Sequence, residues 1–265
     1  MTPLRITSAH NALLQRVRKL AQDSAAYRVQ GEVWVEGEHL CAAARARGRP
    51  ASVAVLSETA WARPDLSSLA AWAARVVVVP DALFARVCGL PSPSGVGFLL
   101  PWSAPTGRPD AGRTVVLDRV QDAGNVGSIL RSASALGFSQ VLALKGTAAL
   151  WSAKVLRAGM GAQFGLTLHE GLEEGDLVDL DLPLLATSSH AALPVDRADL
   201  PDPCAWVFGS EGQGISPGLL GRCAVQVTIP QPGGEESLNV AAAAAICLHE
   251  SSRRRRQAAK TAKDR

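Results

Sequence analysis

The sequence lacks several features that would place it in a specialised class. No stretch of 18 or more residues is continuously apolar, so we expect no membrane span. No apolar run follows a basic start, so we expect no secretory signal. The five cysteines form neither a CxxC pair nor a Cys/His cluster with zinc spacing. These absences predict a cytoplasmic protein with reduced, buried thiols and no bound metal.

Common catalytic motifs are missing as well. There is no Walker loop, because no glycine-rich turn ends in Gly-Lys-Ser/Thr, and no Gly-x-Gly-x-x-Gly follows an early strand. There is also no Gly-x-Ser-x-Gly elbow, which argues against a serine hydrolase. The histidines are isolated from one another, and structural or surface roles suit each of them better than catalysis. They are His10, His39, His169, His190 and His249.

The composition is that of a soluble globular protein. The 265 residues are 47% hydrophobic and 19% charged, which allows one or two domains with a real core. The net charge of +3 is unevenly spread: +4 over residues 1–100, −7 over 101–252 and +6 over 253–265. Basic ends around an acidic middle suggest that the first domain and the tail grip a polyanion. For the arginine run at 253–256, the alternatives are a solvated charge run or a helix end that complements its own dipole.

The pattern of apolar residues predicts a small α/β domain over residues 1–100 and a linker rich in proline and glycine over 101–112. In the first domain we expect helices over 11–25, 39–47, 61–73 and 81–87, and strands over 32–36, 52–56, 75–79 and 96–100.

A second domain is expected over residues 113–252, followed by a basic tail over 253–265. Its predicted strands cover 114–117, 141–144, 166–168, 184–186, 205–208 and 225–229, and its predicted helices cover 126–136, 152–160 and 238–251. Alternation of helices with continuously apolar strands indicates a parallel sheet covered on both faces.

Three short polar signatures follow predicted strands of this second domain. The first is Asn125-x-Gly127-x-x-x-Arg131, in which Asp122 or Asn125 could cap the helix. We expect Asn125 and Arg131 to lie roughly on one side, near a helix end that attracts phosphate or carboxylate. A capped surface helix with a solvated arginine is the simpler alternative.

The second signature is Gly209-Ser210-Glu211-Gly212-x-Gly214, whose glycines permit a close approach of backbone to a ligand. The third is Ile229-Pro230 followed by Ser237-Leu238-Asn239, where Ser237 is placed to cap a helix opened by Leu238. A plain glycine-rich loop and a plain helix cap are the simpler alternatives. Because ligand sites of open α/β sheets form at the carboxyl ends of strands, three such turns predict one shared pocket.

Together the three signatures resemble those of the SpoU (TrmH-like) family of RNA ribose 2′-O-methyltransferases, within the SPOUT superfamily. The stretch Ser152-x-Lys154-x-x-Arg157-Ala158-x-x-Gly161-Ala162 is also similar to one found between the first two signatures. The resemblance implies S-adenosylmethionine as methyl donor, an RNA ribose 2′-hydroxyl as acceptor, a deep C-terminal trefoil knot and a homodimer whose site is completed across the interface. It also implies an N-terminal substrate-binding domain similar to the ribosomal protein L30e fold. Ribosomal RNA is the expected substrate, by analogy with enzymes that carry such an extension.

The resemblance also assigns roles to residues at matching positions. The residues expected to contact the cofactor are Gly209, Ile229 and Leu238, with Thr187 as a further candidate. The residues expected to act in catalysis or to shape the site are Arg131, Asn125, Glu211, Ser237 and Asn239. One departure is Ala241, which stands where many relatives have a serine. Three alternatives stay open: a non-catalytic RNA-binding protein that keeps the fold, a tRNA ribose 2′-O-methyltransferase, and an ordinary doubly wound nucleotide-binding enzyme. The last of these would need a glycine fingerprint after the first strand, which is absent.

Overall fold

The computed structural model describes residues 2–88, 92–233 and 237–263, and the chain divides into two compact units. The first unit holds the chain up to Ala104 together with Ala149–Phe164, and the second holds Pro105–Ala148 and the chain from Gly165 onward. The boundary near Ala104 falls inside the linker expected over 101–112. Residues 149–164, which we expected to continue the second domain, pack with the first unit instead.

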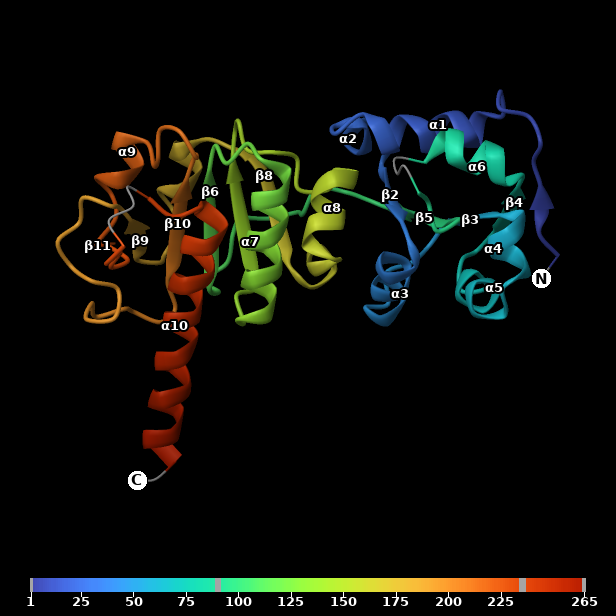
Figure 1. Cartoon of the computed structure of the whole chain (residues 1–265). Helices are drawn as coiled ribbons and strands as arrows, with labels where there is room; N and C mark the ends of the chain where they lie inside the picture. The colour runs from blue at the N-terminus through green and yellow to red at the C-terminus, as the bar shows by residue number, and fades with distance from the viewer. Residues whose placement is uncertain (1, 89–91, 234–236, 264–265) are drawn as a thin grey trace. The chain divides into compact units, whose positions relative to one another are not determined.

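The first unit is built on a mixed sheet with strand order β1-β4-β3-β5-β2 (Figure 1). Strand β5 runs antiparallel to both of its neighbours, and the remaining pairs are parallel. Its elements are β1 (Leu4–Arg5), α1 (Ala12–Gln22), α2 (Ala26–Gln30), β2 (Glu32–Glu36), α3 (Glu38–Ala46), β3 (Val53–Ser57), α4 (Glu58–Ala62), α5 (Pro64–Ala70), β4 (Val76–Val79), α6 (Asp81–Val87), β5 (Val96–Pro101) and α8 (Ala153–Gly159).

Helix ends in the first unit follow local chemistry. The Asn11 side chain accepts a hydrogen bond from the Leu13 N–H at 3.0 Å and starts α1. The helix predicted over 11–25 ends at Gln22, and a separate short helix follows. The helix predicted over 61–73 is two helices, α4 and α5. Pro64 separates them, because proline has no N–H to donate and is accommodated only in the first turn of a helix.

The second unit has a sheet with strand order β11-β9-β10-β6-β7-β8, in which every pairing is parallel, as predicted. Its elements are β6 (Thr114–Asp118), α7 (Ala123–Ala135), β7 (Gln140–Leu144), β8 (Thr167–Leu172), the 3₁₀ helix η2 (Glu174–Leu177), β9 (Leu184–Thr187), β10 (Ala205–Gly209), α9 (Pro217–Leu220), β11 (Val225–Val227) and α10 (Val240–Lys263). A further 3₁₀ helix, η1 (Ala162–Gly165), spans the boundary between the units.

Both faces of this sheet are covered. Alternate side chains of one face, among them Val116 and Val207, pack with Leu177 of η2 and Leu219 of α9 in a buried cluster. Helices α7 and α10 pack against each other, and α10 also packs on β10 (Figure 1). On the side of the sheet covered by α10, the buried Trp206 indole donates a hydrogen bond of 2.8 Å to the hydroxyl of Ser251 in α10.

Helix α10 differs most from its prediction. It begins at Val240 instead of Leu238 and continues to Lys263, beyond the expected end at Ser251. Its C-terminal part extends past the sheet of the second unit (Figure 1). Strand β8 is longer than predicted, β11 ends two residues early, and β1 and α9 were not predicted. Among the described residues, no helix combines the length and apolar character needed to cross a membrane.

Candidate active site

Strands β6, β9, β10 and β11 all point the same way, so the loops that leave their carboxyl ends meet at one edge of the sheet. These loops carry the three polar signatures. The first begins in the first turn of α7, just after the loop that leaves β6, the second lies at the end of β10, and the third lies between β11 and α10. The parallel topology therefore gathers segments that lie more than 80 residues apart in the sequence.

The side chain of Asn125 joins the three signatures. Its Nδ2 donates to Glu211 Oε1 at 2.9 Å, and its Oδ1 accepts from Asn239 Nδ2 at 2.9 Å. The backbone N–H of Gln121 donates to the second oxygen of Glu211 at 3.4 Å. Asp122 caps α7 by accepting a 2.7 Å hydrogen bond from the Asn125 N–H, which fixes the start of the helix that presents Asn125. Of the two capping candidates, the structure selects Asp122.

The cap of α10 is Asn239, and the expectation that Ser237 would cap it is wrong. The Asn239 side-chain oxygen accepts from the N–H groups of Ala241 at 2.9 Å and Ala242 at 3.2 Å. One amide therefore performs two tasks: its oxygen starts a helix and its nitrogen holds Asn125. The helix begins two residues later than predicted because asparagine is as good a cap as serine. Part of the preceding loop, residues 234–236, lies outside the described residues.

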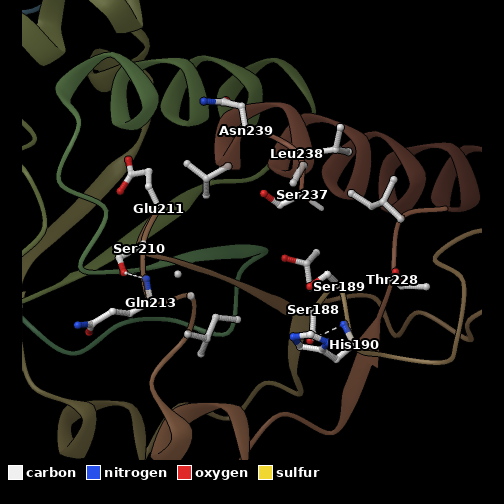
Figure 2. Close-up of a pocket in the computed structure, with 18 of the residues that line it drawn as sticks. Ser188, Ser189, His190, Ser210, Glu211, Gln213, Thr228, Ser237, Leu238 and Asn239 are labelled. Atoms are coloured by element: carbon white, nitrogen blue, oxygen red, sulfur yellow. Dashed lines mark hydrogen bonds between the residues drawn. The ribbon is translucent and has the colours of Figure 1, made fainter. Parts of the chain in front are cut away.

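A pocket of about 990 Å³ lies between these loops (Figure 2). All four residues expected to contact the cofactor line it, and so do Glu211, Ser237 and Asn239. The apolar part of its wall includes Ile215, Leu220, Ile229, Leu238 and Val240, and hydroxyl groups come from Thr187, Ser188, Ser189, Ser210, Thr228 and Ser237. The pocket thus offers a ligand both apolar surfaces and many hydrogen-bonding groups.

The loop after β10 is held in a tight conformation. Ser210 and Gly214 exchange two backbone hydrogen bonds of 3.0 and 2.9 Å, and Gly214 has a φ of +67°. A Cβ at Gly209 would lie 2.1 Å from the backbone carbon of Gly214. Glycine at 209 is therefore required by the close approach of the loop to its own strand.

The charges of the pocket are set by neighbouring groups. Partial burial raises the pKa of the Glu211 carboxyl. The hydrogen bonds that it accepts from the Asn125 side chain and from backbone N–H groups outweigh this effect, and the net pKa lies below its ordinary value. Glu211 is therefore a carboxylate at neutral pH.

A second acidic residue, Asp118 at the end of β6, helps to hold the loop after β10. The buried Asp118 accepts from Arg119 Nε at 2.7 Å and from the Ser216 N–H at 2.6 Å. Arg119 also donates to the Gln213 side chain at 3.3 Å, and the hydrogen bond to Asp118 raises the pKa of its guanidinium. Arg119 has a φ of 59°, an uncommon conformation for a residue other than glycine. Asp118 and Arg119 thus tie the end of β6 to the loop after β10.

Arg131 is not part of this cluster within the chain. Its side chain is exposed, it is not among the residues lining the pocket, and it forms no hydrogen bond or ion pair with other described residues. The expectation that it shares a side of α7 with Asn125 is wrong, because six helical positions separate two side chains by about 120° around the axis.

Several residues of the pocket carried no recognisable signal in the sequence. Ser188, Ser189 and His190 follow the carboxyl end of β9 and line the wall away from Glu211 and Asn239 (Figure 2). Their position at a strand end was the available clue, but they belong to none of the three signatures. His190 lines the pocket, and its backbone N–H donates to the Ser188 hydroxyl at 3.2 Å. No group of three His, Cys, Asp or Glu residues suited to hold a metal ion occurs in the described part of the chain.

The chain is similar to known RNA methyltransferases in sequence and in structure. Residues 112–249 match the model of the SpoU rRNA Methylase family. The chain belongs to this family. An uncharacterized tRNA/rRNA methyltransferase of Synechocystis sp. is 33% identical over 97% of the chain and 96% of its own length. The 23S rRNA (guanosine-2′-O-)-methyltransferase RlmB of Bordetella pertussis is 34% identical, over 53% of this chain and 59% of its own. The alignment with RlmB thus spans little more than half of either protein.

Two solved structures are similar to this SpoU protein over nearly the full length. A crystal structure described as an RNA 2′-O ribose methyltransferase has a TM-score of 0.79 and 28% identity, covering 95% of this chain and 99% of its own. An AdoMet-bound rRNA methyltransferase from Sinorhizobium meliloti has a TM-score of 0.81 and 25% identity, covering 95% and 97%. The similarity therefore includes the first unit as well as the SpoU region.

Proposed function

We propose that this SpoU protein transfers a methyl group from S-adenosylmethionine to a ribose 2′-hydroxyl of RNA, and that the RNA is ribosomal. The main support is the hydrogen-bonded set Glu211, Asn125 and Asn239, which joins all three signatures beside one pocket. Relatives named as 23S rRNA 2′-O-methyltransferases support the substrate class.

The pocket suits S-adenosylmethionine in size and chemistry. Apolar side chains such as Ile229 and Leu238 can cover an adenine ring, Thr187 offers a hydroxyl, and the backbone around Gly209 is open to close approach. The carboxylate of Glu211 supplies a negative charge at the edge of a pocket that takes a cation. When bound, S-adenosylmethionine would supply an electrophilic methyl carbon attached to a positively charged sulfur. Alignment of that carbon with an acceptor oxygen supplies roughly 7–11 kcal/mol of acceleration in well-oriented cases.

The polar residues then position the acceptor. A guanidinium stays protonated in proteins, so Arg131 acts as a fixed positive charge that orients the ribose or an adjacent phosphate and stabilises developing alkoxide charge. Asn125 and Glu211 hold the turn of α7 against the loop after β10. Asn239 keeps the Asn125 amide in its orientation, and Ser237 stands at the pocket rim as a further hydroxyl.

The site is completed by a second copy of the chain. Arg131 is exposed on α7 and does not line the pocket of its own chain, so it is free to serve the pocket of a partner. The run Ala241–Ala245 gives the start of α10 small side chains, and Ile246, the next residue, is 40% exposed. A homodimer that packs through this region would cover the apolar face and bring Arg131 to the partner's pocket.

Further parts of the proposal rest on the family resemblance. They are a trefoil knot in the second unit, an L30e-like substrate-binding role for the first unit and a cytoplasmic location. In the first unit, Arg16, Arg18, Lys19 and Arg28 are candidates for phosphate contacts, and Arg16 also pairs with Glu32 at 3.2 Å. Deleting residues 1–100 should weaken RNA binding far more than cofactor binding.

The decisive experiment follows methyl transfer from labelled S-adenosylmethionine to ribosomal RNA, with the modified nucleotide mapped as 2′-O-methyl. R131A and E211Q should each lose at least about 100-fold in turnover. Mixed subunits of R131A and E211Q should regain about a quarter of wild-type activity, because each heterodimer then holds one intact site. An inactive mixture would refute the shared site, and near-normal turnover of R131A alone would refute its role.

Cofactor binding separates this proposal from its rivals. Calorimetry should detect S-adenosylmethionine binding in both the wild type and R131A. A protein that binds RNA but takes up no S-adenosylmethionine would be the non-catalytic alternative. Methylation of transfer RNA in preference to ribosomal RNA would establish the tRNA alternative, which the name of the Synechocystis relative leaves open.

A further inference from the structure

The last part of α10 forms a distinct element that we call the basic arm, residues 253–263. It is helical throughout, and its sequence, Arg-Arg-Arg-Arg-Gln-Ala-Ala-Lys-Thr-Ala-Lys, has no acidic residue. It lies beyond the part of α10 that packs on the sheet (Figure 1). The preceding segment, 101–252, carries a net charge of −7, so the arm concentrates positive charge at one end of an acidic unit.

One arginine of the arm has a structural task. The Arg254 guanidinium donates to the backbone oxygens of Val195 at 3.3 Å, Asp196 at 2.8 Å and Ala198, and its Nε contacts Glu250 at 2.7 Å. These four hydrogen bonds use four of the five N–H donors of the Arg254 guanidinium within its own chain. Arg254 therefore attaches the base of the arm to the second unit and sets which side of the helix faces inward.

Three other basic residues lie on a different side of the helix, and we call them the basic stripe: Arg253, Arg256 and Lys260. Their spacing of three and four residues places them within about 60° around the axis, and between about 100° and 160° away from Arg254. His249, one turn earlier and exposed, falls in the same arc. The stripe is thus turned away from the contact that Arg254 makes.

The stripe is only partly neutralised. Arg253 shares the Glu250 carboxylate with Arg254, at 2.7 Å from Nη2 to Oε1. Arg256 donates only to the Ser252 hydroxyl, at 3.0 Å, and Lys260 has no hydrogen bond or ion pair among the residues that the structure describes. Both are exposed, so two uncompensated cations lie along about 6 Å of one helix face.

The side chains of the basic arm indicate what kind of partner it can bind. Apart from alanine it has no apolar side chain, so it cannot bury an apolar face in a membrane or in a protein groove. The cations repeat along one side of the helix, as phosphate charges repeat along a nucleic-acid backbone. Such contacts to phosphate carry no sequence information. Resting on the proposed function, we propose that the basic stripe binds the phosphate backbone of the substrate RNA, independently of its sequence, while Arg254 serves only to anchor the arm.

The test compares two double variants that each remove two positive charges. The stripe variant is Arg256→Gln with Lys260→Gln. The control is Arg197→Gln with Arg255→Gln. Both residues are exposed, and within the described parts of the chain the one side-chain partner of Arg255 is Asp202, in an ion pair of 3.8 Å. Arg255 also lies about 100° to 160° around the helix axis from the residues of the stripe. Affinity for fluorescently labelled 23S ribosomal RNA is measured over a series of salt concentrations, with S-adenosylmethionine binding followed by calorimetry on the same samples.

The stripe variant should bind the RNA about 10-fold more weakly near physiological salt, and its plot of log affinity against log salt should be flatter by about 1 to 2. The control should lose clearly less in both measures, and S-adenosylmethionine binding should be unchanged in both. Equal losses in the two variants, or none in the stripe variant, would overturn the inference while leaving the methyltransferase proposal intact. A wild type that binds no RNA would overturn both. Stripe-dependent binding to phosphatidylglycerol vesicles with unchanged RNA affinity would reassign the arm to membranes and overturn it as well.

Discussion

The side chains of Asn125 and Glu211, 86 positions apart in the sequence, are joined by a hydrogen bond of 2.9 Å from Nδ2 to Oε1. A carboxylate can only accept, so this contact fixes which end of the Asn125 amide faces Glu211. The amide oxygen is then left to accept from Asn239. A single side chain thereby sets the relative placement of the three loops around the pocket.

Replacing Asn125 should therefore disturb catalysis more than stability. In N125D a second carboxylate would face Glu211 and the donor would be lost, so we expect methyl transfer to fall by about 100-fold or more. The free energy of unfolding should fall by only about 1 kcal/mol, because the contact is partly exposed. The matched control is Q121A, which keeps the backbone N–H that Gln121 donates to Glu211. Equal activity of N125D and Q121A would contradict the role assigned to Asn125.

Two glycines, Gly209 at the end of β10 and Gly212 in the loop after it, test how closely this side of the pocket is packed. In G209A the added methyl group would lie 2.1 Å from the backbone carbon of Gly214 and 2.2 Å from the Ile215 nitrogen, and neither can yield without moving the loop. We expect stability to fall by about 2 kcal/mol or more, and S-adenosylmethionine affinity to drop at least about 10-fold. In G212A the added methyl group meets nothing within 4 Å, so both measures should stay close to wild type. Thermal melts measure the stability of the two variants, and calorimetry measures their affinity for S-adenosylmethionine. Equal effects of G209A and G212A would contradict this account of the packing.

Much of this architecture could be predicted from the sequence. Strands such as Val141–Leu144 are continuously apolar because they are buried on both faces, and that pattern indicates a parallel sheet with helices on each side. The topology then requires that loops at the strand ends meet, which is why residues as distant as Asn125 and Asn239 could be expected in one site.

What could not be predicted depends on contacts without a local signal. The division of the helix at Pro64 is an exception, because the proline itself was a local signal. The packing of Ala149–Phe164 with the first unit, in contrast, depends on tertiary structure. The extension of α10 to Lys263 depends in part on the backbone oxygens that receive Arg254, which belong to a loop more than 50 residues earlier. Thr187 could be proposed only by resemblance, and His190 was not proposed because it belongs to no signature.

The hydrogen bond between Trp206 and Ser251 should make a measurable contribution to stability. Both side chains are buried, and the indole N–H has the Ser251 hydroxyl as its acceptor at 2.8 Å. Substitution S251A leaves a buried donor unpaired, so we expect a loss of about 1–3 kcal/mol in the free energy of unfolding. S251T, which keeps a hydroxyl, should lose less. A loss in S251A no larger than that in S251T would show that the hydroxyl contributes little, and urea denaturation of the three proteins measures the difference.

The base of α10 should lose stability in acid. Hydrogen bonds from Arg253, with others from Arg254, lower the pKa of the Glu250 carboxyl to about 2 from an ordinary value of 4.5. Because the folded pKa is the lower one, the carboxylate stabilises the fold fully above pH 4.5, and this contribution disappears as the pH falls from 4.5 toward 2. E250Q lacks the charge at every pH. It should therefore be about 2 kcal/mol less stable than wild type at pH 7 and nearly equal to it at pH 2. Since the other carboxyl groups titrate alike in both proteins, a gap that stays constant between pH 7 and pH 2 would show that Glu250 is not the group responsible.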